Sequence, residues 1–221
     1  MPPVPATDTR VIVFARAPEP GRAKTRLVPL LGAGGAAALQ SLLIERTLAT
    51  ALAASIGQVE LWCEPSAQHP LLCEFMQRHG IEGVTQCDGD LGERMQHAAM
   101  SALATASRIL LIGTDCPALT AAALRAAAAA LEAHDAVLIP AEDGGYVLLG
   151  LNWWDTRLFT NIAWGGDQVL TATRERLATL NWRWHELPTL WDVDRPEDFA
   201  RLSASGIMPE LVDTLALPRG G

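Results

Sequence analysis

The chain has 221 residues, of which 49% are hydrophobic and 19% are charged. This balance excludes an intrinsically disordered protein, whose charged fraction would be higher and whose apolar fraction would be lower. The 17 basic and 25 acidic side chains give a formal net charge of −8, which argues against a protein that binds nucleic acid through a basic face.

No apolar run reaches about 18 residues, the minimum for a helix that spans a membrane. The N-terminal residues carry neither a basic start nor a long apolar stretch, so no signal peptide is readable. The four cysteines lack the Cys-x-x-Cys pairing and the histidine spacing of a zinc site. They are Cys63, Cys73, Cys87 and Cys116. These observations predict a cytoplasmic protein with reduced thiols and no membrane partner.

Short apolar runs alternate with Ala- and Leu-rich segments along the chain, which is typical of an α/β protein. Strands are expected at 11–15, 59–63, 84–87, 109–112, 136–140, 146–151 and 182–187. Helices are expected at 35–54, 71–79, 93–107, 120–134 and 168–179. The alternation favours a mixed, mostly parallel sheet of about seven strands with helices on both faces. In such sheets ligands bind beyond the carboxyl ends of the strands.

The first candidate site follows the first predicted strand, where four cations lie within eleven residues of an otherwise acidic chain. They are Arg16, Arg22, Lys24 and Arg26. Such cations, with the free backbone N–H groups of a turn at Gly21, suit a polyphosphate. The stretch is not a P-loop, because Ala23 and Pro18 stand where that motif requires glycine. A solvated basic turn is the alternative interpretation.

Asp115 directly follows the strongly apolar strand 109–112, at the edge of the sheet where ligands bind. A carboxylate there could hold Mg²⁺ against phosphate oxygens, or it could only cap the following turn. The neighbouring Cys116 is disfavoured as a nucleophile, because no histidine stands in a position that suggests a partner.

Two further acidic motifs lie downstream. Asp143 is followed by Gly144 and Gly145 between two strands, which favours a backbone-exposing turn that faces a substrate, with a plain hairpin turn as the alternative. Asp192 and Asp194 alternate, so in an extended chain both point to one side and can share a cation. A dehalogenase-type phosphatase is not expected, since its Asp-x-Asp motif is followed by a threonine that is missing here.

Five motifs in order carry a resemblance to a known family. They are 14–27 (FARAPEPGRAKTRL), 89–95 (GDLGERM), 113–117 (GTDCP), 143–146 (DGGY) and 192–198 (DVDRPED). Together they resemble the DUF2064 family of GT-A-fold nucleotide-diphospho-sugar transferases, which is related to molybdopterin guanylyltransferase and phospholactate guanylyltransferase. Those relatives usually open with a Gly-rich loop, where this chain has Pro18 and Pro20.

The resemblance covers about residues 10–204 and implies one domain there, with tails at 1–9 and 205–221. The implied fold is a three-layer α/β/α sandwich of the GT-A, Rossmann-like type. The nucleotide-binding residues that follow are Arg16, Gly21, Arg22, Lys24 and Arg26 for the phosphates, and Gln86, Asp90, Leu91 and Gly92 for the base. Asp115 and Asp194 are implied ligands of Mg²⁺ or Mn²⁺, and Asp143, Gly144 and Gly145 are expected at the substrate.

We therefore expect a transferase in which Lys24, Arg26 and Asp115 are catalytic. The favoured reaction is metal-dependent nucleotidyl transfer from a nucleoside triphosphate to a phosphorylated small molecule, because four cations exceed the need of a diphosphate-sugar. A glycosyltransferase that uses a nucleotide-sugar, with a small-molecule acceptor, and a catalytically silent nucleotide-binding module remain as alternatives. Replacing Lys24 or Asp115 should cost little stability if both side chains face an open cleft.

Overall fold

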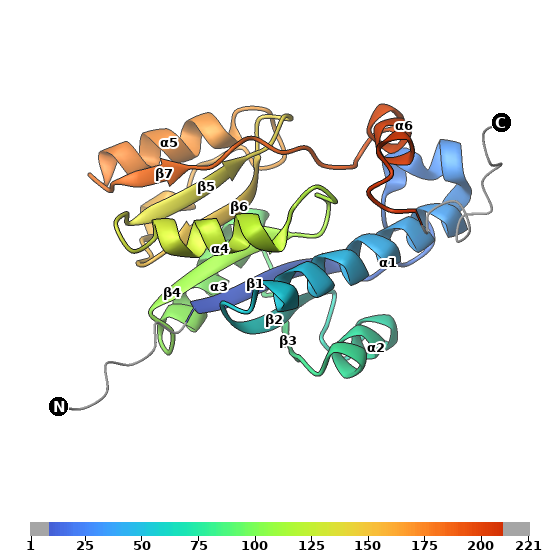
Figure 1. The fold of residues 1–221 in the computed structure, drawn as a ribbon, viewed down its shortest axis with the longest axis horizontal. Helices are drawn as coiled ribbons and strands as arrows, with labels where there is room; N and C mark the ends of the chain where they lie inside the picture. The colour runs from blue at the N-terminus through green and yellow to red at the C-terminus, as the bar shows by residue number, and fades with distance from the viewer. Residues whose placement is uncertain (1–8, 210–221) are drawn as a thin grey trace.

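The computed structural model describes residues 9–209, which are arranged around one sheet (Figure 1). Its strands are β1 (Thr9–Arg16), β2 (Gly57–Glu64), β3 (Glu82–Thr85), β4 (Arg108–Gly113), β5 (Ala136–Pro140), β6 (Tyr146–Leu151) and β7 (Trp184–Glu186). They lie in the order β3-β2-β1-β4-β6-β5-β7. Strand β6 runs antiparallel to β4 and β5, whereas the other pairs are parallel. The predicted mixed, mostly parallel seven-stranded sheet is confirmed.

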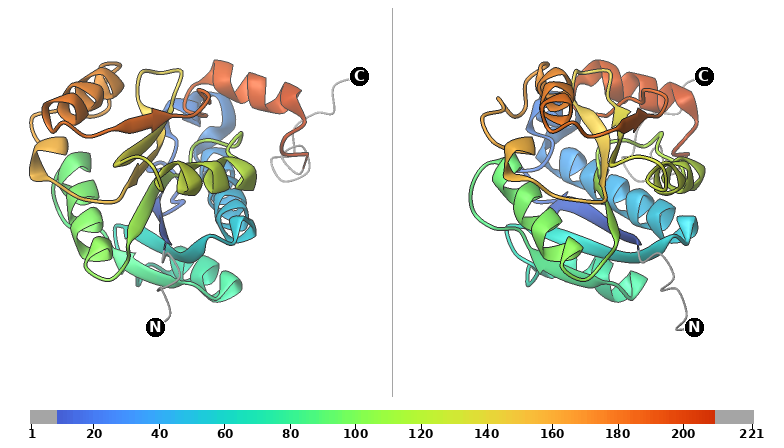
Figure 2. Two further views of the ribbon diagram at one scale, coloured as in Figure 1. Left: turned by 60° about the vertical axis from the view of Figure 1, so that its left-hand side comes forward. Right: turned by 90° about the vertical axis from the view of Figure 1, so that its left-hand side faces the viewer.

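Helices cover both faces of the sheet and give three layers (Figure 2). They are η1 (Thr25–Leu27), α1 (Val28–Ala54), α2 (Pro70–His79), α3 (Leu91–Leu103), α4 (Ala121–Ala130), η2 (Thr156–Leu158), α5 (Val169–Thr179) and α6 (Pro196–Ser205). Apolar residues of α1, α2 and α4 pack on one face, and those of α3, η2 and α5 pack on the other. The predicted three-layer α/β/α arrangement is confirmed.

The central strands are apolar on both sides because both faces are covered. In β1, Val11 and Val13 belong to the cluster on the α1 side, whereas Ile12 belongs to the cluster on the α3 side. All three are fully buried. A continuous apolar run is the pattern that a strand buried on both faces requires. This explains why the strands of the sheet were readable from the sequence.

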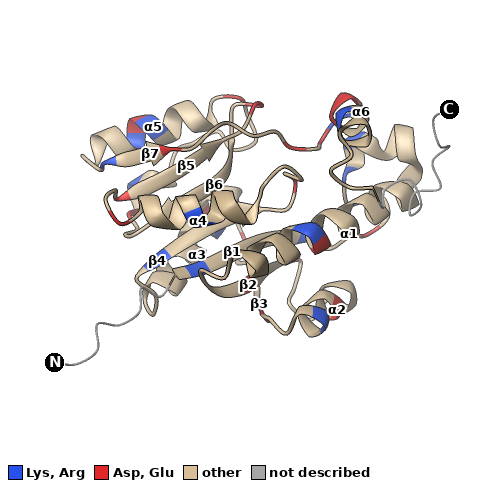
Figure 3. Ribbon diagram, viewed as in Figure 1, with Lys and Arg blue, Asp and Glu red and all other residues tan. Residues whose placement is uncertain are grey.

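Helix α1 begins seven residues earlier than the predicted start at residue 35. Gly32 interrupts its regular geometry with a φ of 70°, and such a glycine-rich start weakens the helical signal in the sequence. By length and composition alone, Thr25–Ala54 could cross a membrane, although its apolar residues do not form one unbroken run. Within α1 itself the charged residues are Glu45 and Arg46, in one turn (Figure 3). In the fold, apolar residues of α1 pack against the sheet and α6.

Other boundaries differ from expectation by a few residues. Strand β3 lies two residues earlier, and β7 is shorter at both ends. Helix α4 ends at Ala130 rather than near 134, but its predicted cap is confirmed, since the Thr120 side chain accepts a 3.1 Å hydrogen bond from the Ala123 N–H. The expected tails fall mostly outside residues 9–209. Within the described part of the C-terminal one, Met208 is buried against α1 and α6.

Strands β1, β2, β4 and β5 run in one direction and end at one edge of the sheet. Arg16 and Glu64 are the last residues of β1 and β2 and are partners in the register. Asp115 follows β4, and Ala141 follows β5. This edge gathers the side chains from which a site can be built.

Candidate functional site

Two adjoining cavities open at the carboxyl edge of the sheet. The first cleft, about 650 Å³, lies over the ends of β1, β2 and β4, and the second pocket, about 380 Å³, lies beside it over β4, β5 and β6. Residues that line both are Arg26, Leu91, Gly113, Asp115 and Asp194. A ligand in the first cleft can therefore contact one in the second pocket, with Asp115 and Asp194 between them.

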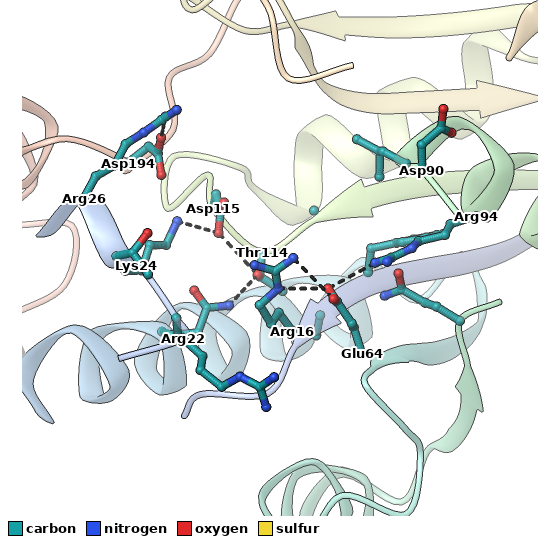
Figure 4. Close-up of a pocket in the computed structure, with 18 of the residues that line it drawn as sticks. Arg16, Arg22, Lys24, Arg26, Glu64, Asp90, Arg94, Thr114, Asp115 and Asp194 are labelled. Atoms are coloured by element: carbon teal, nitrogen blue, oxygen red, sulfur yellow. Dashed lines mark hydrogen bonds and ion pairs between the residues drawn. The ribbon is translucent and has the colours of Figure 1, made fainter. Parts of the chain in front are cut away.

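Lys24 lies in the first cleft, and its backbone adopts the left-handed conformation (φ 47°, ψ 46°). Its Nζ atom is 2.7 Å from Asp115 Oδ1 (Figure 4). The same atom donates a 2.7 Å hydrogen bond to the Val193 carbonyl. The Lys24 side chain is only 4% exposed, whereas that of Asp115 is 48% exposed. The condition of an open setting is not met for Lys24, because the segment around Val193, 169 residues away in sequence, covers it.

Backbone and side-chain hydrogen bonds hold Asp115 in place. The Val193 N–H donates to the Asp115 carbonyl at 2.8 Å. Gln40 donates a 3.1 Å hydrogen bond to the Thr114 hydroxyl, which in turn lies 3.4 Å from Asp115 Oδ1. Within residues 9–209 the Asp115 carboxylate accepts no hydrogen bond from the turn that follows it, so the capping alternative has no support.

Arg26 and Asp194 form an ion pair where the two cavities meet. The backbone N–H groups of Asp194 and Arg195 donate to Asp198 Oδ2 at 3.1 and 2.8 Å. This cap fixes the start of α6 and with it the position of Asp194. Asp192 lines the second pocket together with Asp194, so the alternating pair does face one cavity.

Arg16 faces Glu64 across the neighbouring strand ends, with Arg16 Nε 2.8 Å from Glu64 Oε2 (Figure 4). Arg94 of α3 reaches the same oxygen atom at 3.1 Å. Burial acts to raise the pKa of Glu64, but the hydrogen bonds and charges of the two arginines outweigh it and hold that pKa below its usual value. The sequence analysis missed Glu64 and Arg94. Glu64 was detectable, because it follows a predicted strand on the ligand-binding edge.

The charges of the first cleft are nearly balanced. Five cationic and four anionic side chains line it, a formal net charge of +1. Arg22 also lines the cleft, yet it is 74% exposed and pairs with Glu19 at 3.1 Å. Gly21 turns the backbone before it with a φ of 79° and lies outside the lining. The positive charge that the sequence gathers between residues 16 and 26 is therefore mostly neutralised in the fold.

Three of the four residues expected near a base line the first cleft, namely Gln86, Asp90 and Leu91. Gln86 Nε2 donates a 2.7 Å hydrogen bond to the Trp62 carbonyl, which fixes the orientation of the amide. Leu91 is exposed and borders both cavities. The two side chains thus offer one polar and one apolar contact at the α3 side of the cleft.

Asp90 and Gly92, at the start of α3, have structural roles: Asp90 caps the helix, and Gly92 leaves room for Trp164. Asp90 Oδ1 accepts a 2.9 Å hydrogen bond from the Glu93 N–H, and the Glu93 side chain accepts one from the Asp90 N–H at 2.8 Å. This reciprocal cap starts α3. Asp90 also lines the first cleft, whereas Gly92 does not. A Cβ on Gly92 would lie 2.3 Å from Trp164 Nε1, so glycine allows the Trp164 loop to pack closely.

The turn that follows β5 borders the second pocket through Asp143 and Gly145. Asp143 Oδ1 accepts a 2.9 Å hydrogen bond from the Gly145 N–H. Gly144, outside the lining, has a φ of 90°, and a Cβ there would lie 2.1 Å from the Asp167 carbonyl oxygen. The segment is a turn between β5 and β6 that also presents a carboxylate to a cavity.

Carboxylates dominate the polar lining of the second pocket. They are Asp115, Asp143, Asp192 and Asp194. Burial, then the negative charges of Asp143 and Asp115, raises the pKa of Asp192 to about 6, while Lys24 acts in the opposite direction. The apolar lining includes Trp164 and Tyr146. The pocket therefore combines aromatic surface with hydrogen-bond acceptors.

Cys116 lines the second pocket but is unsuited to nucleophilic chemistry. Burial raises the pKa of its thiol to about 11, so it stays protonated near neutral pH. All four cysteines are free thiols, as expected.

The carboxylates at the junction of the two cavities are the candidate ligands of a divalent cation. Within residues 9–209, His, Cys, Asp and Glu side chains form no group of three or more that could hold a metal by themselves. Mg²⁺ commonly binds through one or two carboxylates and takes its remaining ligands from substrate phosphates and water. Asp115 and Asp194, at the junction of the two cavities, fit that requirement. The sequence-predicted residues meet here except Gly21, Gly92 and Gly144, which shape the backbone around the site.

Comparison with known families gives one match. The model of DUF2064, described as an uncharacterized protein conserved in bacteria, matches residues 47–166, which is more than half of the chain. The matched part includes Asp115 but neither the loop of Lys24 nor the segment of Asp194. No match is found among curated proteins.

Solved structures share the fold. A candidate nucleotide-diphospho-sugar transferase from Desulfovibrio desulfuricans G20 is 27% identical with a TM-score of 0.80, over 94% of this chain and 96% of that one. 4-Diphosphocytidyl-2C-methyl-D-erythritol synthase from Anaerococcus prevotii DSM 20548 is 11% identical with a TM-score of 0.62, over 90% and 96%. CMP:2-keto-3-deoxy-manno-octonic acid synthetase complexed with CTP is 12% identical with a TM-score of 0.59, over 91% and 99%. The expected GT-A-like fold is confirmed.

Proposed function

Because the chain belongs to the DUF2064 family and has the fold of nucleotidyl and nucleotide-sugar transferases, we propose that it transfers a group between a nucleotide and a small molecule. The nucleotide occupies the first cleft, and the acceptor occupies the second pocket. The observation that carries the proposal is the Lys24–Asp115 pair at 2.7 Å, set where a cationic cleft and an acidic pocket meet.

The preferred reaction is nucleotidyl transfer from a nucleoside triphosphate. Arg16, Arg22 and Arg26 border the first cleft and can hold phosphate oxygens by charge-assisted hydrogen bonds. Lys24 is already fixed by two partners, so its positive charge needs no reorganisation as charge develops on the phosphates. Mg²⁺ held by Asp115 and Asp194 would supply further neutralisation of phosphate charge.

Glycosyl transfer from a nucleotide-sugar is the second candidate. The near balance of charge in the first cleft favours it, because the surplus of cations that pointed to a triphosphate is mostly neutralised. Incubation with ATP, CTP, GTP or UTP and an acceptor panel, with pyrophosphate measured, tests the first reaction. Incubation with nucleotide-sugars, with nucleoside diphosphate measured, tests the second. Nucleotide binding without either product would instead indicate a silent binding module.

The role of Asp115 is tested by calorimetric nucleotide titration with and without Mg²⁺. Asp115→Asn should remove most of the Mg²⁺-dependent gain in affinity and leave metal-free binding nearly unchanged. Asp90→Asn is the matched control, since it removes the same charge from the same cleft and asparagine caps a helix as well as aspartate does. An equal loss of affinity for Asp115→Asn with and without metal would assign Asp115 a structural role.

A further inference from the structure

The carboxylates of the second pocket differ in their partners. Asp194 pairs with Arg26, and Asp115 pairs with Lys24. Within residues 9–209, Asp143 and Asp192 form no ion pair, although both line the pocket. The side of the pocket away from the first cleft is therefore acidic and without a cation of its own.

The charge of the lining follows from these residues. One cationic and four anionic side chains give the second pocket a formal net charge of −3, and a divalent cation at the junction would leave −1. A phosphate monoester brings about −1.5 to −2 at neutral pH. A phosphate group in the second pocket would face the carboxylates of Asp143 and Asp192. Five cationic side chains line the adjoining first cleft. Phosphate groups are thus directed to the first cleft and away from the second pocket.

We propose that the acceptor is a polyhydroxylated small molecule that carries no phosphate in the second pocket. This rests on the proposed function and replaces the phosphorylated acceptor that the sequence favoured. Carboxylate oxygens accept hydrogen bonds from hydroxyl groups, and Trp164 and Tyr146 provide apolar surface for the carbon-bound face of such a molecule. The volume of about 380 Å³ lies within the range of small-molecule sites.

The reaction balances for such an acceptor. In nucleotidyl transfer, an acceptor hydroxyl oxygen forms a bond to the α-phosphorus of the triphosphate, and the bond from that phosphorus to the pyrophosphate oxygen breaks. The hydroxyl proton passes to water, and pyrophosphate leaves. No oxidant, reductant or protein-bound intermediate is required.

Acceptor binding can be measured with the first cleft filled. Wild-type protein is saturated with a non-hydrolysable analogue of the triphosphate that binds best, and calorimetry then compares glycerol, D-glucose and myo-inositol with their monophosphate esters. At least one free compound should bind tenfold or more tightly than its ester. Tighter binding of an ester than of its free partner would overturn the proposal. If no nucleotide binds at all, the proposed function itself fails, which the preceding titration reveals.

A variant then shows whether the carboxylates cause the selectivity. Asp143→Asn keeps the acceptor for the Gly145 N–H and should strengthen binding of the phosphate esters about fivefold by removing one negative charge. Asp167→Asn is the control, because Asp167 packs against the same turn but is exposed and outside both linings. No gain for the esters in Asp143→Asn, or equal gains in both variants, would show that the charge of Asp143 does not exclude phosphate.

Discussion

Replacing Lys24 tests how much its buried side chain contributes to the stability of the fold. The Lys24→Ala change removes a charge-assisted hydrogen bond of about 1.5–3 kcal/mol and leaves the Val193 carbonyl, in a fully buried residue, without its donor at a cost of about 1–3 kcal/mol. Asp115 is half exposed, so water can solvate its freed charge and little is added. Because both figures describe the same broken hydrogen bond, they overlap, and we expect a loss of about 2–4 kcal/mol in the free energy of unfolding.

Two further variants separate the side chain from the backbone. Lys24 has a left-handed backbone, so Lys24→Gly relieves strain and should be about 0.5–1 kcal/mol more stable than Lys24→Ala, against the usual order of these residues. In a double-mutant cycle with Asp115→Asn, the coupling energy should be about 0.5–1 kcal/mol, because Asp115 is half exposed. Urea unfolding followed by tryptophan fluorescence measures all of these. A loss below about 0.5 kcal/mol for Lys24→Ala would refute the reasoning.

Three other changes have expected outcomes. The pKa of Asp192 is raised from 3.8 to about 6, so between these values the native state binds more protons than the unfolded chain, and stability falls as pH rises through that window. Asp192→Asn should flatten this dependence in urea unfolding at pH 4.5 and 6.5 without metal, and an unchanged slope would contradict it. Glu64→Gln should free the two arginines that it pairs with and tighten nucleotide binding about two- to fivefold at low salt, with a steeper salt dependence. Glu45→Gln, whose partners lie away from the cleft, should leave titrations unchanged. Gly92→Ala should lower the free energy of unfolding by about 1–3 kcal/mol, because the added methyl group clashes with Trp164. Urea unfolding measures this loss, and an unchanged free energy would show that the Trp164 loop can shift.

The sheet was readable from the sequence because each buried strand carries an unbroken apolar run, such as 109–112 in β4. The first turns of α1 could not be predicted from the sequence, because Gly32, Gly34 and Gly35 weaken the helical pattern there. Packing against the rest of the chain sustains these turns. The antiparallel insertion of β6 between β4 and β5 also left no local signal, because strand order depends on contacts distant in sequence.

The sequence predicted which residues belong to the site, but not which of them form ion pairs with one another. The rule that ligands bind beyond strand ends located Arg16 and Asp115, and it would have located Glu64 had it been applied to every strand. Pairing was hidden, since Lys24 meets Asp115 across 91 residues of sequence and Val193 across 169. The cluster of cations at 16–26 therefore overstated the positive charge of the cleft, because most of the carboxylates that pair with them come from distant parts of the chain.

The meeting of Lys24, Asp115 and Val193 has a consequence for the order in which the protein matures. During synthesis, residue 24 leaves the ribosome early, and all strands from β1 to β6 have been synthesised once residue 151 has emerged. The carbonyl that anchors the Lys24 ammonium group, and the N–H that holds the Asp115 backbone, both arrive with Val193, after the last strand of the sheet. The growing chain can thus assemble most of its core before the contacts of Val193 with Lys24 and Asp115 can form. The site that we propose for the nucleotide is therefore completed after the sheet that carries it.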